Sequence, residues 1–236
     1  MGILEVKMKP IVEDIGVNLI MNNRGFLRMF QEVANIASTK IGFGITQTEA
    51  THFTWVILYW RLEILDRPQY EDEITIKTWA TFSKKLYSIR NFEMYVGNKL
   101  VARADSKWTL VDIESHKVLK IPDDMADKYG VVEKRVFEDD LKEKLAIPQD
   151  YTSSITYKIM KRDLDVNHHV NNLSYLSIAS ELINDEDYSN ASFINIIFKK
   201  EITYGDTIEC LYKDNIVYLC NEDKSFVHGA VIIKYL

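Results

Sequence analysis

The feature that most constrains the fold of this chain is an internal repeat. Residues 13–35 align without a gap on residues 162–184 when the sequence is shifted by 149 positions. Eight of the 23 aligned pairs are identical, far more than unrelated segments share, and these are Asp14/Asp163, Val17/Val166, Asn18/Asn167, Asn22/Asn171, Asn23/Asn172, Leu27/Leu176, Glu32/Glu181 and Asn35/Asn184. The chain is therefore expected to contain two similar units.

Both copies of the repeat contain a polar, Asn-rich turn followed by apolar residues at helical spacing, which predicts one central helix in each half. In the first copy the apolar positions are Phe26, Leu27, Phe30, Val33, Ala34 and Ala37, before Gly42 and Gly44. In the second copy they are Leu173, Leu176, Ala179, Leu182 and Ile183. Glycine commonly ends a helix, so the first helix should stop near residue 42.

Each predicted helix is followed by runs of β-forming residues separated by short turns. The first half has such runs at residues 55–65, 73–82, 87–96 and 99–112, and the second at 193–203, 207–212, 216–220 and 226–235. Strands grouped around one helix per half predict an α+β fold. We expect a first unit over residues 1–130, a linker over 131–150 and a second unit over 151–236. The charged segment from Pro122 to about Asp150 is interpreted as solvated chain that carries a short helix.

Composition excludes several classes of protein. A net charge of -6 argues against general nucleic-acid binding, which needs a strongly basic face. The two cysteines, Cys210 and Cys220, lack the spacing of a disulfide framework or a zinc site and are expected to be buried thiols. The N-terminus lacks the apolar core of a signal peptide, and no apolar run is long enough to cross a membrane. A cytoplasmic protein without stable membrane association is expected.

Positions at which the two copies differ in chemical type are candidates for function. Asp165 aligns with Gly16 and His169 with Ile20, so only the second copy carries a carboxylate and an imidazole just before a helix N-terminus. Free amides at such a terminus suit an oxyanion, and His or a carboxylate can serve as the base for water. Asn171 and Asn172 recur in the first copy and are interpreted as turn and cap residues. His168 and His169 do not indicate a metal pair, because adjacent side chains diverge.

The segment Asp-Leu-Asp-Val-Asn-His-His-Val-Asn-Asn-Leu-Ser-Tyr, residues 163–175, resembles the signature D-L-D-V-N-Q-H-V-N-N-x-x-Y of the acyl-[acyl carrier protein] thioesterases, of the bacterial oleoyl or medium-chain type. The looser pattern D-x-x-x-H-V-N-N-x-x-Y of acyl-CoA thioesterases is also satisfied. Further family landmarks are Trp55-Val56, Thr78-Trp79-Ala80 and the runs at 102–108 and 120–123.

The resemblance implies a tandem hot-dog fold, in which two curved antiparallel sheets each wrap one central helix. It also implies a catalytic site of Asp165, Asn167, His169 and Glu201, without cofactor or metal. Glu201 enters because residues 199–202 resemble the family's R-R-E-C segment, expected on a strand. The cysteine of that segment is Ile202 here, which excludes a covalent acyl-cysteine at this position and favours direct attack by water. Amides near Val170 and Asn171 are expected to polarise the thioester carbonyl.

The resemblance further implies that the substrate partner is acyl carrier protein loaded with a fatty acyl chain; a homodimer is also compatible with it. An apolar chain pocket is expected in the first unit, with Phe26, Met29, Phe30, Val33, Trp55 and Ile57 as candidate lining residues. Because both carrier and chain are acidic, a local basic patch must supply docking. The candidate basic residues are Lys84, Lys85, Arg90, Lys161, Arg162, Lys199 and Lys200.

Two alternative functions stay open at this point. An acyl-CoA thioesterase differs only in whether the entrance binds a nucleotide or a carrier protein. A non-catalytic acyl-binding hot-dog protein is disfavoured by the joint presence of Asp165, Asn167, His169 and Glu201. The hot-dog dehydratases are disfavoured because their G-D-x-N-x-x-H motif is absent.

Overall fold

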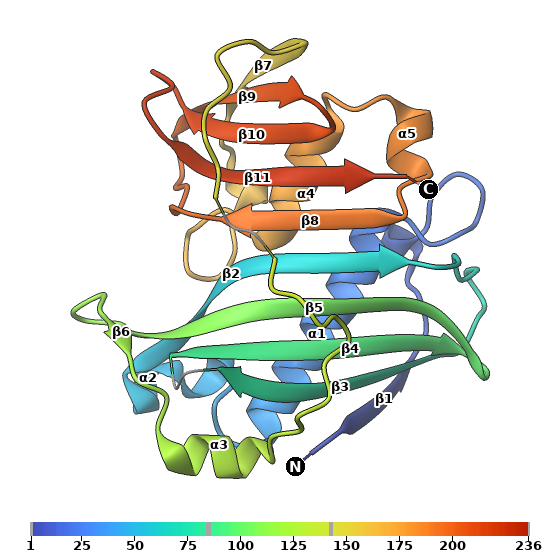
Figure 1. The fold of residues 1–236 in the computed structure, drawn as a ribbon, viewed down its shortest axis with the longest axis vertical. Coiled ribbons are helices and arrows are strands. Elements are labelled where there is room, and N and C mark those ends of the chain that lie inside the picture. The colour runs from blue at the N-terminus through green and yellow to red at the C-terminus, as the bar shows by residue number, and fades with distance from the viewer. Residues whose placement is uncertain (1, 84–85, 142–143, 236) are drawn as a thin grey trace. The chain divides into compact units, whose positions relative to one another are not determined.

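In a computed structural model, the chain is described over residues 2–83, 86–141 and 144–235. It divides into two compact units, Met1–Asp140 and Leu141–Leu236, so the boundary lies inside the segment predicted to be a linker. Each unit is α+β, as the sequence predicts, with a central helix on one face of an antiparallel sheet (Figure 1). Among the described residues, no helix is both long and apolar enough to span a membrane.

The sheet of the first unit contains four long antiparallel strands. They are β2 (Phe53–Ile64), β3 (Ile74–Ser83), β4 (Tyr87–Val96) and β5 (Lys99–Asp112). β3, β4 and β5 follow one another as hairpins, whereas β2 precedes them in sequence and pairs with β5. Two short strands complete the sheet: β1 (Leu4–Met8) pairs with β3, and β6 (Val118–Leu119) pairs with β5.

The central helix of the first unit is α1 (Asn23–Lys40), which ends close to the glycines predicted to stop it. Its N-cap is Asn22, whose side chain accepts a hydrogen bond from the Gly25 amide at 2.8 Å and so satisfies one unpaired donor of the first turn. The apolar positions of the repeat are all buried. One of them, Phe30, packs on Phe92 of β4 with ring centroids 5.1 Å apart, which places the apolar face of α1 against the sheet.

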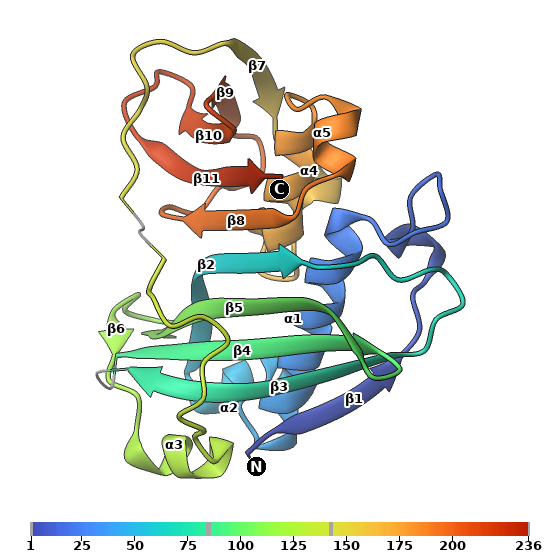
Figure 2. The ribbon, with the colours of Figure 1, turned by 45° about the vertical axis from the view of Figure 1, so that its right-hand side comes forward.

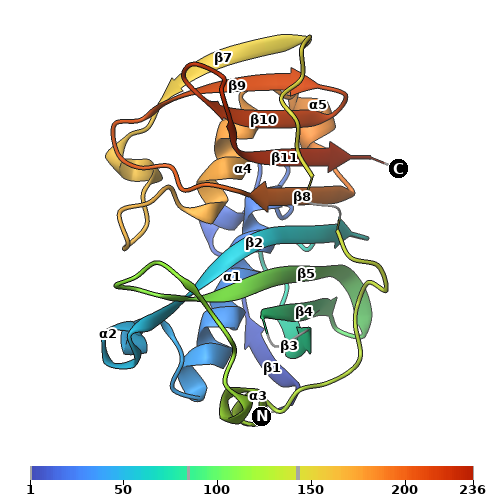
Figure 3. The same cartoon turned by 60° about the vertical axis from the view of Figure 1, so that its left-hand side comes forward.

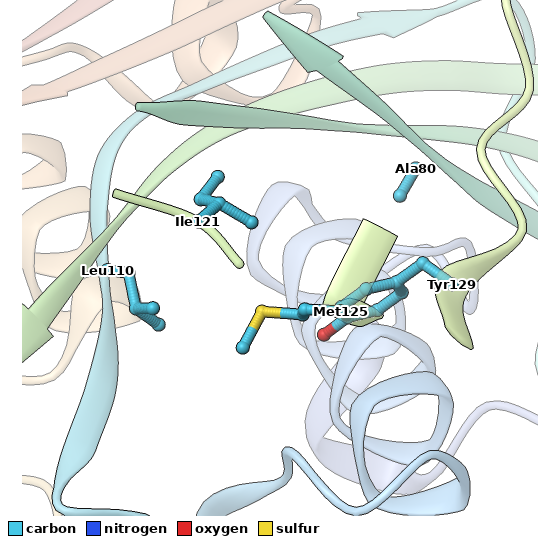
Figure 4. Close-up of a cluster of buried hydrophobic side chains, with 5 residues drawn as sticks. All are labelled: Ala80, Leu110, Ile121, Met125 and Tyr129. Atoms are coloured by element: carbon cyan, nitrogen blue, oxygen red, sulfur yellow. The ribbon is translucent and has the colours of Figure 1, made fainter. Parts of the chain in front are cut away.

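A further apolar cluster joins α3 (Asp123–Tyr129) to strands β3 and β5 of the first unit. It consists of Ala80, Leu110, Ile121, Met125 and Tyr129, which converge in Figure 4. The Tyr129 hydroxyl also hydrogen-bonds Ser38 Oγ at 2.9 Å, so the cluster contacts the last turn of α1. Three short helical segments lie elsewhere in this unit: η1 (Val12–Asp14), η2 (Ile45–Gln47) and α2 (Thr48–Thr51).

Residues 131–140 form an irregular strap that crosses the sheet on the face away from α1 (Figure 2). Side chains of the sheet bind its main chain: Trp79 Nε1 donates to Lys134 O at 2.6 Å, Thr81 Oγ1 donates to Val132 O at 2.7 Å, and Val136 N donates to Asn91 Oδ1 at 3.1 Å. The strap is therefore part of the first unit, because polar groups of the sheet satisfy a backbone that forms no regular structure.

Under the strap lies a buried ion pair between facing residues of β2 and β5. Arg61 donates to both carboxylate oxygens of Asp105, at 3.0 and 2.7 Å, and the two side chains are 7% and 0% exposed. The strap covers this pair, since the Phe137 ring lies 4.0 Å from the guanidinium carbon and Asp139 accepts a further bond at 3.1 Å. The paired geometry offsets part of the desolvation of both charges, although burial still raises the pKa of Asp105.

The second unit repeats the topology of the first in shorter form (Figure 3). Its sheet order is β8-β11-β10-β9-β7, which matches β2-β5-β4-β3-β1 strand for strand. The strands are β7 (Ser153–Lys158), β8 (Phe193–Phe198), β9 (Thr207–Lys213), β10 (Ile216–Asn221) and β11 (Val227–Lys234). Its helices are η3 (Lys161–Asp163), α4 (Asn172–Ser180) and α5 (Asp185–Ser189).

The buried ion pair generates a prediction about stability. Asp105→Ala leaves the Arg61 guanidinium buried without its carboxylate, so the free energy of unfolding should fall by about 3 to 5 kcal/mol, measured by urea denaturation. Lys7→Ala, which removes an exposed pair with Glu73, should leave the free energy of unfolding almost unchanged. Equal effects of the two substitutions would contradict the importance assigned to the buried pair.

Candidate active site

The turn that precedes α4 carries three of the four predicted site residues. It is closed by two main-chain hydrogen bonds, from Asp165 N to His169 O at 2.8 Å and from His168 N to Asp165 O at 3.2 Å. His168 adopts a left-handed conformation with φ of 63°, which reverses the chain and returns His169 toward Asp165. The turn thus gathers Asp165, Asn167 and His169 beside the start of the helix.

The first unit contains the same turn and keeps Asn18 in place of Asn167, but it has Gly16 and Ile20 in place of Asp165 and His169. Gly16 N donates to Ile20 O at 2.9 Å, and Leu19, which aligns with His168, is also left-handed with φ of 59°. A leucine side chain cannot hydrogen-bond locally to favour this conformation, so the surrounding fold imposes it. The scaffold of the site, including the asparagine at positions 18 and 167, is therefore common to both units, whereas Asp165 and His169 are found in the second alone.

The Asp165 carboxylate binds within its own turn. Oδ1 accepts hydrogen bonds from the amides of Asn167 at 2.8 Å and His169 at 3.2 Å, and Oδ2 lies 3.5 Å from Asn167 Nδ2. These bonds satisfy main-chain donors that the tight turn would otherwise leave to water. The geometry therefore indicates that Asp165 fixes the positions of Asn167 and His169.

His169 faces Glu201, the residue that sequence comparison within the chain did not identify and the family resemblance did. His169 Nε2 lies 3.3 Å from Glu201 Oε2, and the side chains are 38% and 60% exposed. Glu201 was expected on a strand, but β8 ends at Phe198, and Glu201 follows it in an irregular segment. The pair is thus open to solvent, and its two side chains lie within hydrogen-bonding distance of each other.

The position of Glu201 in the first unit is occupied by Arg67. The two are equivalent because Pro68 O accepts from Met21 N at 2.7 Å, as Ile202 O accepts from Val170 N at 2.8 Å. Arg67 binds Met21 O at 2.9 Å and Asn23 Oδ1 at 2.8 Å. Ile20 is apolar and Arg67 is a cation, so the first unit lacks the imidazole–carboxylate pair at this place.

The expectation that the amides of Val170 and Asn171 are available for an oxyanion is wrong. Val170 N donates to Ile202 O, and Asn171 N donates to Asp163 O at 2.7 Å, so both are occupied by main-chain carbonyls. Asn171 itself is the N-cap, accepting from Leu173 N at 2.9 Å, as its interpretation as a cap residue predicts.

The predicted chain-pocket residues lie in the core of the first unit. Phe26, Met29, Phe30 and Val33 are fully buried on α1 and Ile57 is nearly so, whereas Trp55 is half-buried beside the α3 cluster. Burial of this kind is what core packing alone requires. Their role in binding an acyl chain stays a prediction.

Four of the predicted docking residues are exposed on the segments that build the site. Lys161 and Arg162 precede the Asp165 turn, and Lys199 and Lys200 precede Glu201. The prediction that Arg90 belongs to an exposed docking patch is wrong. Arg90 is 4% exposed, its guanidinium lies over the Tyr129 ring, and burial lowers its pKa. Lys84 and Lys85 lie outside the described residues.

The two cysteines are buried thiols, as predicted. Burial raises the pKa of Cys210 to about 12 and that of Cys220 to about 11, so neither is a thiolate at neutral pH. Among the described residues no three His, Cys, Asp or Glu side chains gather in a way that would hold a metal ion.

One residue beside the site was missed by the sequence reasoning. His228 of β11 is 5% exposed, and its Nδ1 lies 3.0 Å from Glu201 O. Burial lowers the pKa of His228, which keeps the imidazole neutral. Its equivalent in the first unit is Val101, because Val101 O and His228 O accept from matching amides after β2 and β8. The difference between Val101 and His228 could have indicated a role for His228. However, the ungapped repeat ends at residues 35 and 184, so the sequence comparison does not align these two positions.

Sequence comparisons match the chain to one family in both units. The model for the acyl-ACP thioesterase N-terminal domain matches residues 4–129, and the model for the acyl-ACP thioesterase C-terminal domain matches residues 148–232. Oleoyl-acyl carrier protein thioesterases 2 and 1 of Arabidopsis thaliana chloroplasts are 27% and 28% identical over 84% and 88% of this chain. The alignments span 59% and 63% of those relatives, so the chain covers less than two thirds of their length.

Structural comparison finds the same arrangement in solved proteins. An acyl-ACP thioesterase from Bacteroides thetaiotaomicron superposes with a TM-score of 0.83 over 98% of both chains at 20% identity. The 12:0-ACP thioesterase from Umbellularia californica superposes with the same score over 98% of this chain and 97% of its own, at 18% identity. The predicted tandem hot-dog fold is thereby confirmed.

Burial of His228 generates a prediction about pH. In the unfolded chain this imidazole binds a proton below about pH 6.5, whereas in the folded chain it stays neutral to lower pH. Its contribution to stability is therefore complete above the unfolded pKa and is lost as the pH falls below it. Urea unfolding at about pH 7.5 and about pH 5.5 should show a smaller acid-induced loss of stability for His228→Asn than for wild type. His116→Asn, at an exposed histidine, is the control; identical pH dependence in all three proteins would contradict the prediction.

Proposed function

Because the chain belongs to the acyl-ACP thioesterase family, we propose that it hydrolyses the thioester of fatty acyl-[acyl carrier protein] and releases free fatty acid. The observation that carries this proposal is the His169–Glu201 pair, with 3.3 Å between Nε2 and Oε2, present only in the unit whose turn also carries Asp165 and Asn167. Thioester hydrolysis needs a base for water beside an electrophilic carbonyl, and this pair is an exposed base at a helix start.

The proposed reaction uses the pair as one unit. Glu201 accepts a proton from water while His169 Nε2 donates a hydrogen bond to the same carboxylate and orients it. The water oxygen bonds to the thioester carbon, the carbonyl oxygen becomes an oxyanion, and the carbon–sulfur bond then breaks. The proton passes to the leaving sulfur, so the products are a fatty acid and the thiol of the carrier.

Asp165 and Asn167 support this chemistry differently. Asp165 holds the turn, and Asn167 is an exposed amide next to the pair that can bind the water or the carbonyl. With the Val170 and Asn171 amides occupied, Asn172 N is the first amide of α4 for which the described part of the chain shows no acceptor. We assign the oxyanion to Asn172 N, where the helix dipole adds a partial positive charge.

The absence of a thiol at position 202 supports attack by water. Ile202 is buried and carries no nucleophile, and both cysteines of the chain lie in the sheet of the second unit with raised pKa values. A covalent acyl-enzyme at these positions would require a buried, protonated thiol. Direct hydrolysis is the simpler route for this set of residues.

The alternatives weighed from the sequence are separable by substrate. An acyl-CoA thioesterase would prefer a nucleotide-bearing thiol, and an acyl-binding protein would retain chains without turnover. The family membership favours the carrier protein. The cytoplasmic location and a homodimeric state stay predictions.

The first test is hydrolysis of matched acyl-ACP and acyl-CoA substrates from about C8 to about C18. Glu201→Gln and His169→Ala should each lower kcat on acyl-ACP by about a hundredfold or more, because the first removes the base and the second removes the group that orients it. Glu181→Gln, an exposed carboxylate of the same unit, should retain wild-type turnover. Wild-type rates in both site variants would refute the assignment, and a preference of wild type for acyl-CoA would refute the substrate class.

A second test addresses carrier docking. Lys161→Ala combined with Arg162→Ala should raise the KM for acyl-ACP by about tenfold at low salt, because exposed charges steer an acidic partner. Turnover of a small, uncharged acyl-N-acetylcysteamine thioester should not change. Lys213→Ala removes a lysine paired with Asp150 and serves as the control. An unchanged KM for the carrier would show that these two residues do not form the docking surface.

A further inference from the structure

His228 donates a hydrogen bond to the main chain at Glu201. Its Nδ1 lies 3.0 Å from Glu201 O and 3.3 Å from Lys200 O. Both neighbours are carbonyl oxygens, which only accept, so Nδ1 carries the hydrogen and shares it between them. The tautomer is thereby determined, and the imidazole acts as a neutral donor buried against the segment that carries the proposed base.

The main chain of His228 binds the same segment as its side chain does. Its carbonyl accepts from Lys199 N at 2.8 Å and from Lys200 N at 3.0 Å. The ring packs edge-on against Phe226 with centroids 4.8 Å apart, and Lys200 lies over that phenylalanine at 4.1 Å. Residues 199–201 are therefore fixed although the regular strand has ended at Phe198.

The first unit retains the main-chain half of this arrangement. Val101 O accepts from Leu65 N at 2.8 Å and from Asp66 N at 3.0 Å. Valine has no ring donor, and the residue that follows this segment is Arg67 in place of a carboxylate. The imidazole is thus found in the unit that has the glutamate. The first unit forms the same main-chain bonds with a valine, so the fold itself does not require the imidazole.

We propose that His228 is a positioning residue of the thioesterase site, which fixes the main chain of Glu201 so that its carboxylate reaches His169. This inference rests on the proposed function of Glu201. A glutamate in an irregular segment with a largely exposed side chain has many rotamers and a movable backbone. Fixing the backbone restricts where Oε2 can lie, and a displacement near 1 Å is enough to cost about a hundredfold in rate.

Two amide substitutions separate the hydrogen bond from simple packing. In asparagine, Nδ2 is bonded to Cγ, as Nδ1 is in histidine. His228→Asn therefore keeps a hydrogen-bond donor at nearly the same place. Glutamine extends one bond further and places its donor near the position of Nε2. His228→Ala removes both ring and donor. All three are compared by kcat, KM and thermal unfolding on the full chain with acyl-ACP.

We expect His228→Ala and His228→Gln to lower kcat by between about tenfold and about a hundredfold with KM changed less than about twofold. His228→Asn should restore kcat to within about threefold of wild type. In a Glu201→Gln background, His228→Ala should cause no further loss, because the residue it positions is already inactive.

The inference would be overturned if kcat fell in proportion to the thermal midpoint of unfolding, to the same degree in the Asn and the Gln variant. His228 would then have a purely structural role. Full additivity with Glu201→Gln would overturn the inference as well. If Glu201→Gln abolishes turnover and His228→Ala retains wild-type kcat, this inference alone fails. If Glu201→Gln itself retains wild-type kcat, the proposed function of Glu201 fails and the positioning role fails with it.

Discussion

A buried aspartate at the entry to the central helix is the interaction on which each unit depends. In the second unit, Asp163 accepts from Met160 N at 2.8 Å through its side chain, while its carbonyl accepts from Asn171 N at 2.7 Å and Ser174 Oγ at 3.0 Å. One residue thereby joins the strand-to-turn connection to the first turn of α4. Burying this carboxylate is tolerable because its acceptor capacity is used.

The first unit uses the same device with two changes of partner. Asp14 accepts from Ile11 N at 2.9 Å and pairs with Arg28 of α1. A β-carbon at Gly25 would lie 2.6 Å from Asp14 O, so this helix position needs glycine for close approach, whereas Ser174 binds the equivalent carbonyl with its hydroxyl. With both ends of the turn fixed in this way, its side chains can change from Ile20 to His169 without altering the backbone.

The parts of the fold predicted from the sequence are those with a local signal. The ungapped repeat revealed both helices, and within it Asp165 and His169 stood out as differences between the copies. Beyond the repeat, the difference in residue number between equivalent positions of the two units falls, because the second unit has shorter loops and strands. This difference is 149 at the turn, 134 between Arg67 and Glu201, and 127 between Val101 and His228. Comparison along the sequence therefore could not align His228, and Glu201 was found only through the family motif.

Two of the wrong expectations, the available helix amides and the exposed Arg90, share one physical cause, namely partners that are distant in sequence. Val170 N is occupied by a carbonyl from residue 202, which no inspection of the turn reveals. Arg90 lies on a strand whose two faces are both covered, by the α3 cluster on one side and by the strap bound to Asn91 on the other. Alternation of polar and apolar residues identifies a solvent face only where such a face exists.

The strap affects how the first unit folds during its synthesis on the ribosome. Its residues leave the exit tunnel after every strand of the sheet, so the sheet must wait for Phe137 and Asp139 before the face that carries Arg61 is covered. Until then the indole of Trp79 and the amide of Asn91 depend on water. A gene fragment that stops at residue 130, where the last helix ends, would leave the nascent chain permanently in that unfinished state, whereas one that continues through Asp140 would allow it to close.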